Sequence, residues 1–295
     1  MTEQENFIPL THLQKKLAGI LAFNRPGDIA DFEAKYIIRE LTGVSPGELE
    51  LGGERYTEPG IVNAAIAAAE RRLHFEPLQY IFGRAYFMNL ELFVSPDVLI
   101  PRPETELMVE WMVKNAPRNA VMLDVGCGSG AIPLAMADMR SDLRITGVDI
   151  SEAALNVARY NREKCNFPQV ELLKSDLFSG VSGRKFDIIS ANLPYVSEDE
   201  LRICPEEVRK FEPHLALIAA EDGLELIRLA IESAGQFLNP GGLIAMEIGE
   251  TQGARVMELL LDNHFESAEL HYDYNRRPRW VSGIWRGKAG YFKNW

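Results

Sequence analysis

The four residues Asn192-Leu193-Pro194-Tyr195 have types and an order that suit chemistry on a planar nitrogen. The side-chain oxygen of Asn192 can accept one hydrogen bond from an amide or amino group. The backbone carbonyl of Leu193 can accept a second if Pro194 holds the turn, and the ring of Tyr195 can stack on a flat acceptor. Such orientation can lower a reaction barrier by several kcal/mol, up to roughly 7–11. The residues therefore predict a site that holds a nitrogen, although a loop that only ends a strand would use similar residues.

A second candidate site is the run Asp124-Val125-Gly126-Cys127-Gly128-Ser129-Gly130. Its three glycines follow an apolar, strand-like segment and precede an apolar stretch that begins at Ala131. Glycine lets the backbone approach a ligand closely, and the start of a helix offers free N–H groups. Asp149 ends the next strand-like segment, where open sheets place an acid that binds ribose hydroxyls. The pattern predicts a loop that binds a nucleotide-type cofactor.

The glycines alone do not decide which cofactor binds. The run also matches the dinucleotide pattern G-x-G-x-x-G/A, with Ala131 in its last place, and a tight turn without a ligand is a further alternative. A carboxylate at Asp124 could attract an ammonium group but would repel a pyrophosphate. Asp176 follows the third strand, near the expected position of an adenine. These two acids favour S-adenosylmethionine over a nicotinamide cofactor, and together with the turn at Asn192 they predict methyl transfer to nitrogen.

Strands and helices alternate in the part of the chain that must position these two sites. The predicted strands lie at residues 121–125, 143–148, 170–173, 186–191 and 243–248, and residues 280–285 are expected to add an edge strand. Helical stretches lie between them, such as those at residues 151–163 and 223–237. This alternation predicts an α/β fold with a doubly wound, mostly parallel sheet that helices cover on both faces.

The first 75 residues show no strand-like segment and instead have apolar residues at helical spacing. Asp28 is the expected N-cap of a second helix, Gly43 is its expected C-terminal stop, and Pro59 is expected in the first turn of a third helix. The sequence therefore predicts three parts: a small N-terminal helical domain at residues 1–76 that binds substrate, a hairpin connector at residues 77–103, and a methyltransferase domain at residues 104–295.

The composition is that of an ordinary globular protein, with 46% hydrophobic and 25% charged residues. A net charge of −12 argues against a general polyanion binder, so direct binding to nucleic acid is not expected. The three cysteines form no CxxC pair and the five histidines match no ligand spacing, so we expect no metal site. No apolar run approaches the ~20 residues that span a bilayer, and residues Met1 to Asn6 lack the pattern of a secretory signal. We therefore expect a cytoplasmic protein.

Five runs of residues resemble the protein-(glutamine-N5) methyltransferases that modify peptide-chain release factors. They are Ile100 to Glu106 (Ile-Pro-Arg-Pro-Glu-Thr-Glu), Asp124 to Gly130, Ser175 to Phe178, Asn192 to Tyr195 and Phe211 to Pro213. The resemblance covers residues 77–250, and a helical N-terminal domain of this size also fits the family. It implies a class I S-adenosylmethionine-dependent methyltransferase whose substrate is the glutamine in the Gly-Gly-Gln motif of a release factor.

The resemblance also implies roles for individual residues. The acceptor glutamine would be held by Asn192, Leu193, Pro194 and Tyr195. The residues that the resemblance assigns to S-adenosylmethionine are Gly126, Cys127, Gly128, Ser129, Gly130, Asp149, Leu177 and Asn192. Asp124 and Asp176, the two acids discussed above, are also expected to bind it. The family usually has proline where this chain has Leu193. Because the atom that binds the amide there would be a backbone carbonyl, we expect this change to reduce rigidity and to leave the chemistry intact.

Several alternatives remain open on the sequence. Asn-Leu-Pro-Tyr is also typical of rRNA adenine dimethylases, so methylation of adenine N6 in RNA or DNA is an alternative activity. The segment Asn275 to Trp280 departs from the family pattern and is interpreted either as a solvated basic loop or as a contact to the release factor or an accompanying RNA. A nicotinamide oxidoreductase would need a catalytic His, Tyr or Lys constellation, which is not evident. A catalytically silent module would bind cofactor and release factor but transfer no methyl group.

Overall fold

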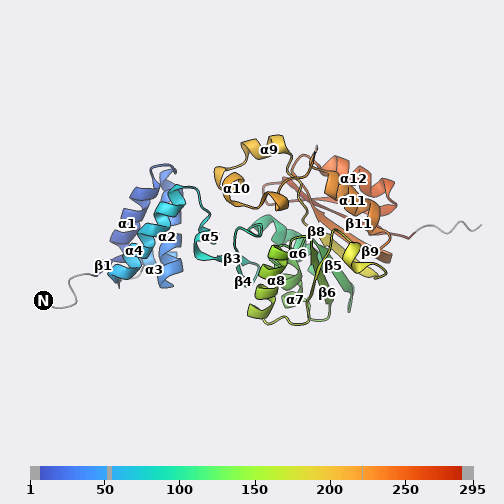
Figure 1. Ribbon diagram of the computed structural model, residues 1–295, viewed down its shortest axis with the longest axis horizontal. Coiled ribbons are helices and arrows are strands. Elements are labelled where there is room, and N and C mark those ends of the chain that lie inside the picture. The colour runs from blue at the N-terminus through green and yellow to red at the C-terminus, as the bar shows by residue number, and fades with distance from the viewer. Residues whose placement is uncertain (1–6, 52–54, 221, 288–295) are drawn as a thin grey trace, which may run out of the picture. The chain divides into compact units, whose positions relative to one another are not determined.

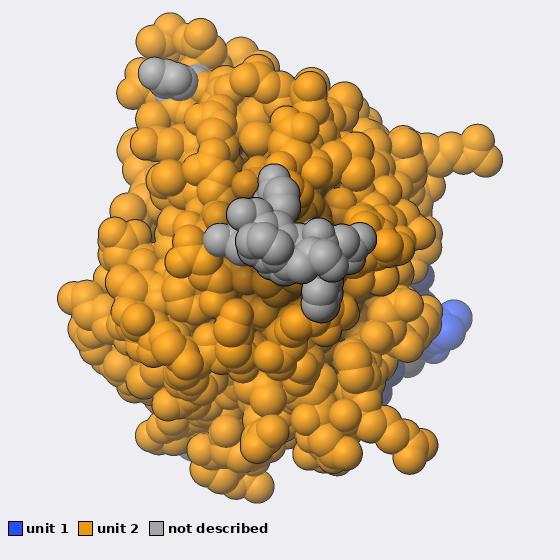
Figure 2. Space-filling view, turned by 90° about the vertical axis from the view of Figure 1, so that its right-hand side faces the viewer, with its two compact units in different colours: residues 1–83, 206–211 blue, residues 84–205, 212–295 orange. Residues whose placement is uncertain are grey.

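The computed structural model describes residues 7–51, 55–220 and 222–287. The chain divides into two compact units, which Figure 2 colours blue and orange. Unit 1 comprises residues 1–83 and 206–211, and unit 2 comprises residues 84–205 and 212–295.

The predicted domain boundaries differ from the limits of these units. The predicted N-terminal domain at residues 1–76 ends inside unit 1, and the predicted connector at residues 77–103 is divided between the units. The difference arises because residues 77–83 continue the helical part of the chain, whereas the hairpin begins at Arg84. The run from Met1 to Asn6 and the last eight residues of the predicted methyltransferase domain, 288–295, lie outside the described residues.

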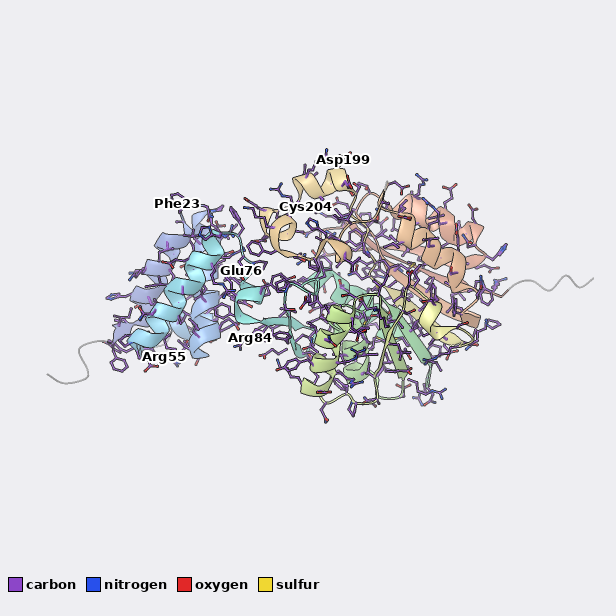
Figure 3. The ribbon with its side chains drawn as sticks, in the orientation of Figure 1. Phe23, Arg55, Glu76, Arg84, Asp199 and Cys204 are labelled. Carbon is purple, nitrogen blue, oxygen red and sulfur yellow. The ribbon has the colours of Figure 1, made fainter. Side chains whose placement is uncertain are left out.

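Unit 1 is built from helices, most of which bury an apolar face, and this confirms the predicted small helical domain. Its helices are α1 (Leu10–Leu21), α2 (Gly27–Thr42), α3 (Pro46–Leu51), α4 (Pro59–Leu73), α5 (Leu78–Phe82) and α10 (Glu206–Phe211) (Figure 1). Leu13, Leu17 and Ile37 are fully buried in its core. Phe23, which follows α1, is 90% exposed (Figure 3).

The predicted absence of strands in the first 75 residues is wrong. β1 (Ile8–Pro9) pairs antiparallel with β2 (Tyr56–Thr57). Each strand has only two residues, which is too short to leave an alternating pattern in the sequence.

The predicted helix ends are correct at two of three positions. Gly43 caps the C-terminus of α2 with a left-handed φ of 74°, and Pro59 is the first residue of α4. Asp28 is not the N-cap of α2, because the helix already begins at Gly27 after Pro26. Asp28 instead lies in the first helical turn, where its negative charge interacts favourably with the helix dipole.

A cluster of charged residues attaches α10 to the rest of unit 1. The carboxylate of Glu207 on α10 lies 2.5 Å from the Arg72 guanidinium and 3.8 Å from that of Arg25. The same two arginines also pair with Glu33 of α2, at 2.6 and 2.8 Å respectively. Arg72 and Glu33 are both buried. Two arginines and two glutamates therefore neutralise one another, and they hold in place a helix from a distant part of the sequence.

Unit 2 contains the predicted sheet. Its seven strands within the described residues have the order β10-β11-β9-β8-β5-β6-β7. The five strands from β9 to β7 are parallel, and β11 is antiparallel to both of its neighbours. The bounds are β5 (Val121–Val125), β6 (Arg144–Asp149), β7 (Glu171–Lys174), β8 (Phe186–Ala191), β9 (Leu238–Glu247), β10 (Phe265–Tyr272) and β11 (Pro278–Trp285). The predicted α/β fold with a doubly wound, mostly parallel sheet is confirmed.

Two layers of helices enclose this sheet (Figure 1). One apolar cluster joins the sheet to α6 (Pro103–Asn115), α7 (Ala131–Met139) and α8 (Glu152–Lys164). The other joins it to α11 (Glu225–Ala234) and α12 (Gly253–Asp262). The side chains of β5 alternate between the clusters, since Met122 belongs to the first and Leu123 to the second. The remaining elements of unit 2 are the hairpin β3 (Arg84–Phe87) and β4 (Leu90–Phe93), the helix α9 (Glu198–Ile203), and the short 3-10 helices at Ser179–Val181 and His214–Ala216.

The prediction of an edge strand at residues 280–285 is wrong in its placement. β11 lies inside the sheet, and the edge is formed by β10, which was not among the predicted strands. The pairing of β10 with β11 shifts register between Glu266 and Glu269, and Ser267 has a positive φ of 51°. This bulge interrupts the alternation by which a strand is recognised in a sequence.

The chain changes direction at the centre of the sheet, between β5 and β8. After β5 the chain builds β6 and β7 on one side, and then it returns to build β8 and β9 on the other side. In open α/β sheets, ligands bind outside the carboxyl ends of the strands at such a switch point. The loop after β5 and the turn after β8 contain the two candidate sites, so the topology brings them to the same place.

Candidate active site

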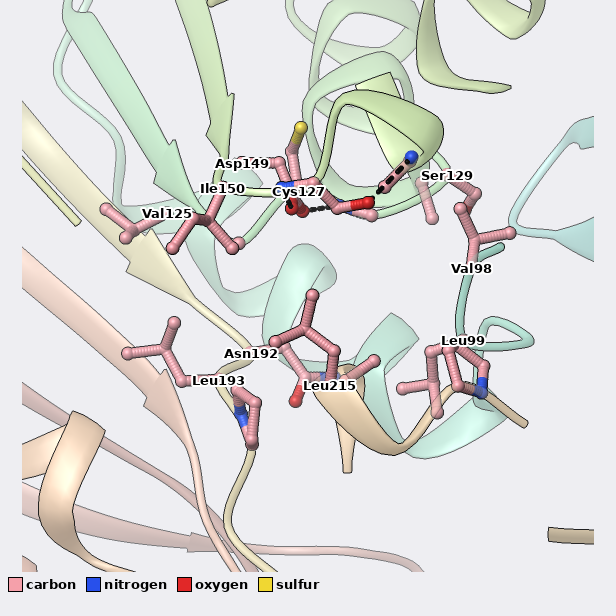
Figure 4. Close-up of a pocket in the computed structure, with 18 of the residues that line it drawn as sticks. Val98, Leu99, Val125, Cys127, Ser129, Asp149, Ile150, Asn192, Leu193 and Leu215 are labelled. Atoms are coloured by element: carbon pink, nitrogen blue, oxygen red, sulfur yellow. Dashed lines mark hydrogen bonds between the residues drawn. The ribbon is translucent and has the colours of Figure 1, made fainter. Parts of the chain in front are cut away.

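A cavity of about 380 Å³ lies at this switch point, within the size range of small-molecule sites. Figure 4 shows residues of the glycine loop and Asp149 on one side of it, and Asn192, Leu193 and Leu215 on the other. The predicted site residues that line the cavity are Gly126, Cys127, Gly128, Ser129, Asp149, Asp176, Leu177, Asn192, Leu193 and Pro194. Asp124, Gly130 and Tyr195 are not among its lining residues within the described part of the chain.

The glycine loop has a backbone conformation that side chains disfavour. Gly126, Gly128 and Gly130 have φ values of 75°, 53° and 83°. A Cβ at Gly126 would stand 3.1 Å from a methyl carbon of Leu193, so this glycine also permits close packing between the loop and the acceptor turn. A Cβ at Gly128 would meet no atom within 4 Å, which leaves open space above the loop. The loop therefore fits a ligand that lies against its backbone.

The carboxylate of Asp149, at the end of β6, orders the loop. It accepts hydrogen bonds from the backbone N–H of Gly128 at 2.8 Å and of Ser151 at 2.9 Å. Burial raises the pKa of Asp149, and the hydrogen bonds that it accepts oppose this shift. Because a carboxylate offers about four lone-pair sites, it retains capacity to accept bonds from the hydroxyls of a bound ribose.

Asp124 lies beneath the loop and is fully buried in β5. The Ser190 hydroxyl donates a hydrogen bond to its Oδ1 at 2.5 Å, whereas its Oδ2 has no partner among the described residues. Burial raises the pKa of Asp124 to about 7 against the opposing effect of Ser190. Since Asp124 does not line the cavity, its predicted contact with an ammonium group stays a prediction.

The turn after β7 presents Asp176 and Leu177 to the cavity. Leu177 has a positive φ of 44°, which is uncommon for a residue with a side chain. Ser175 holds this conformation, because its hydroxyl donates to the Leu177 carbonyl at 2.6 Å and accepts from the Gly180 N–H at 2.8 Å. The turn thus fixes an apolar side chain and an exposed carboxylate at the cavity wall.

The acceptor turn leaves two oxygen atoms unpaired. The Asn192 side-chain nitrogen donates to the Thr105 hydroxyl at 3.5 Å. No described residue donates a hydrogen bond to the Asn192 side-chain oxygen or to the Leu193 carbonyl. Since both residues line the cavity, the turn can accept two N–H groups of a bound amide.

Tyr195 has contacts that its sequence motif does not predict. Its hydroxyl donates to the Glu247 carboxylate at 3.1 Å, and its backbone carbonyl accepts from the Gln252 amide at 2.9 Å. Burial and the neighbouring Glu247 charge raise the pKa of Tyr195 above its usual range, so the phenol stays protonated. A Cβ at Gly223 would stand only 2.4 Å from the Tyr195 carbonyl oxygen, which explains the glycine there. The stacking of Tyr195 on the acceptor stays a prediction.

Several lining residues were missing from the predicted site, although motifs identified in the sequence contain some of them. Arg102 and Thr105 belong to the run from Ile100 to Glu106, and both line the cavity. Arg102 pairs at 2.6 Å with the buried Glu212, which belongs to another of the five runs, Phe211 to Pro213. The residues of these motifs could have been included on that basis.

Comparison with known proteins is consistent with this geometry. Residues 103–215 match the family model described as Methyltransferase small domain, and residues 20–83 match the PrmC N-terminal domain. A release factor glutamine methyltransferase of Geobacter sulfurreducens is 32% identical over 283 residues, which cover 96% of this chain and 99% of that protein. A protein of the same name from Koribacter versatilis is 42% identical over 219 residues, 73% of this chain and 77% of its own length.

The chain belongs to the release factor glutamine methyltransferase family. Membership confirms the resemblance found in the five sequence runs. It also confirms that the chain is a methyltransferase and that S-adenosylmethionine, not a nicotinamide dinucleotide, is its cofactor. The adenine alternative is not favoured, because the relatives are named for glutamine.

The fold of this family member also occurs in more distant proteins. A methyltransferase from Pyrococcus furiosus is 20% identical, with a TM-score of 0.52, and the match covers 74% of this chain and 98% of that one. At this level of identity the likeness shows a shared fold. It supports the class I methyltransferase architecture that the strand order indicates.

Proposed function

We propose that this chain transfers a methyl group from S-adenosylmethionine to the side-chain amide nitrogen of the glutamine in the Gly-Gly-Gln motif of a peptide-chain release factor. The observation that carries the proposal is one cavity lined by both the glycine loop and the acceptor turn. A methyl donor and a planar amide could lie in contact there. The names of the relatives indicate the same acceptor.

The cofactor would be held by the residues that follow β5, β6 and β7. Asp149 would accept hydrogen bonds from its ribose, and Asp176 and Leu177 would flank its adenine. Asp149 and Asp176 line the cavity, and their carboxylates suit a molecule that is positively charged at its sulfur. When bound, S-adenosylmethionine supplies an electrophilic methyl group.

The acceptor turn would overcome the weak nucleophilicity of an amide nitrogen, whose lone pair is delocalised into the carbonyl group. The Asn192 side-chain oxygen and the Leu193 carbonyl would accept its two N–H bonds and so fix the direction of the nitrogen. As the N–C bond forms and the C–S bond breaks, the nitrogen releases one proton to solvent. Orientation of this kind needs neither a metal ion nor a covalent intermediate.

Apolar side chains form the walls between the two subsites. Val98 and Leu99 lie on one side of the cavity and Leu215 faces the glycine loop (Figure 4). These walls would limit access of water to the methyl donor. Because the acceptor belongs to a translation factor, we place the reaction in the cytoplasm. None of the helices in the described ranges combines the length and hydropathy needed to cross a membrane.

The test is incubation of the protein with methyl-labelled S-adenosylmethionine and a release factor. We expect label in the wild-type release factor and none when its Gly-Gly-Gln glutamine is replaced. Asn192→Ala should lower turnover by at least about 100-fold, since it removes one of two hydrogen-bond acceptors that orient the nitrogen. Asn156→Ala is the matched control, because Asn156 is exposed on α8 and should leave turnover unchanged.

Other outcomes would refute the proposal in different ways. Label in added RNA or DNA with steep salt dependence, and none in the release factor, would indicate an adenine methyltransferase instead. Binding of cofactor and release factor without any transfer would indicate a silent binding module. Normal turnover of Asn192→Ala would remove the role assigned to the acceptor turn.

A further inference from the structure

A chain of hydrogen bonds runs behind the acceptor turn and connects both of its ends. The Asn192 amide nitrogen donates to the Thr105 hydroxyl at 3.5 Å, and this hydroxyl donates to Glu247 Oε2 at 2.5 Å. The Tyr195 hydroxyl donates to the other oxygen of Glu247 at 3.1 Å. Thr105 lies in the first turn of α6, and Glu247 is the last residue of β9. Both are only 4% exposed.

The chemistry of these groups determines which atom donates in each of these hydrogen bonds. A carboxylate that has lost its proton can only accept hydrogen bonds, so both hydroxyls must donate to Glu247. The Thr105 hydroxyl has a single proton, which it uses in the hydrogen bond that it donates to Glu247. The Thr105 oxygen can therefore only accept a hydrogen bond from Asn192. The Asn192 atom that faces Thr105 must then be the NH₂ group. The Asn192 oxygen remains for the cavity.

The groups that contact Glu247 oppose the effect of its burial on the carboxylate. Burial raises the pKa of Glu247, and the neighbouring Glu104 adds to this effect. The hydrogen bonds from Thr105 and Tyr195 and the positive charge of Arg279 act in the opposite direction. A buried carboxylate without partners would be costly, so these compensating groups suit a residue that is needed as an acceptor.

We propose that Thr105 and Glu247 are positioning residues that fix the polarity of the Asn192 amide, so that its oxygen faces the acceptor nitrogen. The inference rests on the proposed function. If the Asn192 amide were rotated by 180°, its NH₂ group would face the NH₂ group of the glutamine, and two donors would oppose each other. A rotated amide would instead suit the carboxylate of a glutamate. Thr105 and Glu247 therefore contribute to the choice of glutamine over glutamate.

The test compares three variants with a matched control. Thr105→Val removes the hydroxyl and keeps the shape, Thr105→Ser restores the hydroxyl, and Glu247→Gln replaces one accepting oxygen by a donor. Thr146→Val makes the same change at another buried threonine, in β6, that does not line the cavity. Turnover and KM for a release factor, cofactor Kd and thermal midpoint are measured for each protein.

We expect Thr105→Val and Glu247→Gln to lower kcat by roughly 10- to 100-fold, with the cofactor Kd within about twofold of wild type. Thr105→Ser should recover most of the activity. Thr146→Val should keep the kcat and cofactor Kd of wild type, because its hydroxyl bonds only to Glu171 and Arg184 among the described residues. A purely structural role would lower the thermal midpoint and cofactor affinity without a selective loss of kcat.

A second measurement tests the polarity directly and uses no turnover. A release factor whose Gly-Gly-Gln glutamine is replaced by glutamate serves as a competitive inhibitor. Its affinity relative to the glutamine form should increase at least about tenfold in Thr105→Val, because the Asn192 NH₂ group is then free to face a carboxylate. The inference is wrong, while the proposed function stands, if Thr105→Val and Glu247→Gln both behave as wild type in two respects. These are kcat and the ratio of the affinity for the glutamate form to that for the glutamine form. If wild-type protein does not methylate the release factor, the proposed function itself fails.

Discussion

At the scale of single residues, Leu193 shows how a departure from the family pattern is accommodated. Its side chain is buried, and its methyl group would touch a Cβ at Gly126. The side chain therefore packs against the glycine loop, while the backbone carbonyl stays available to the cavity. Pro194 disfavours the helical conformation at Leu193 and keeps it near extended geometry. Leucine thus changes the packing at this position but not the atom that would bind the amide.

Asp124 makes the stability of the protein depend on pH. Burial raises its pKa from 3.8 in the unfolded chain to about 7 in the folded protein. The folded state therefore keeps a proton that the unfolded state releases, and stability falls as pH rises from about 4 to about 7. We expect Asp124 to lower the free energy of unfolding of wild type by roughly 3 kcal/mol across that window. This decrease should be absent in Asp124→Asn.

Urea denaturation of both proteins at about pH 4.5 and about pH 8 measures this effect. The other carboxylates are common to both proteins, so the difference in unfolding free energy between them isolates Asp124. A difference that does not change between the two pH values would show that Asp124 is ionised at little cost.

At the scale of elements, a buried side chain of α8 supports the cofactor loop in addition to Asp149. Asn161 is fully buried, and its amide group bonds to both backbone groups of Phe93 in β4, at 2.7 and 2.9 Å. Its nitrogen also donates to the carbonyl of Ser129 in the glycine loop at 2.9 Å. One asparagine thus ties a helix, the hairpin and the loop together.

We expect Asn161→Ala to lower the free energy of unfolding by roughly 3 kcal/mol, because three backbone groups at least partly buried lose their partner. It should also weaken cofactor binding, since the loop containing Ser129 lines the cavity. Denaturation and calorimetric titration with S-adenosylmethionine measure the two effects. Asn156→Ala on the exposed face of the same helix should change stability by less than about 0.5 kcal/mol. Equal behaviour of the two variants would contradict the role of Asn161.

At the scale of the whole molecule, the chain does not divide into two consecutive domains. Residues 206–211 belong to unit 1 although the residues on both sides of them belong to unit 2. The chain therefore passes between the units three times, and the segment that follows the acceptor turn enters unit 1. The charged cluster of Arg25, Glu33, Arg72 and Glu207 holds it there. The substrate-binding role of the helical domain stays a prediction.

A double-mutant cycle tests this attachment. Arg72→Met should destabilise the protein by roughly 3 kcal/mol, because it leaves Glu33 buried with one arginine fewer. Glu207→Gln should cost only about 1 kcal/mol, since its carboxylate is about one-third exposed. The double variant should lose less than the sum, and independent losses would show that the pair is not coupled. Arg55→Met is the control, because the Arg55–Glu48 pair is exposed on both sides.

Much of the fold follows from patterns that span only a few residues. The buried strands at β5 and β8 were predicted with their observed bounds, because continuous apolar runs between turns are local signals. β10 was not predicted, since its bulge disturbs the alternation, and the burial of Glu33 and Arg72 was not foreseen because each depends on a distant partner. In α2, Phe32 is exposed while its neighbour Glu33 is buried and paired with Arg72.

The sequence by itself determined the family, the cofactor and the two motifs of the site. Glycines with positive φ and an Asn-x-Pro-aromatic turn meet local requirements of the backbone, so these residue types can be recognised in the sequence without a structure. Only the tertiary structure decided that Thr105, Glu247 and Gln252 support the acceptor turn, and that Asp124 lies beneath the loop without lining the cavity. The physical reason is that hydrogen-bond direction and burial depend on residues that become neighbours only when α6, β8 and β9 pack together.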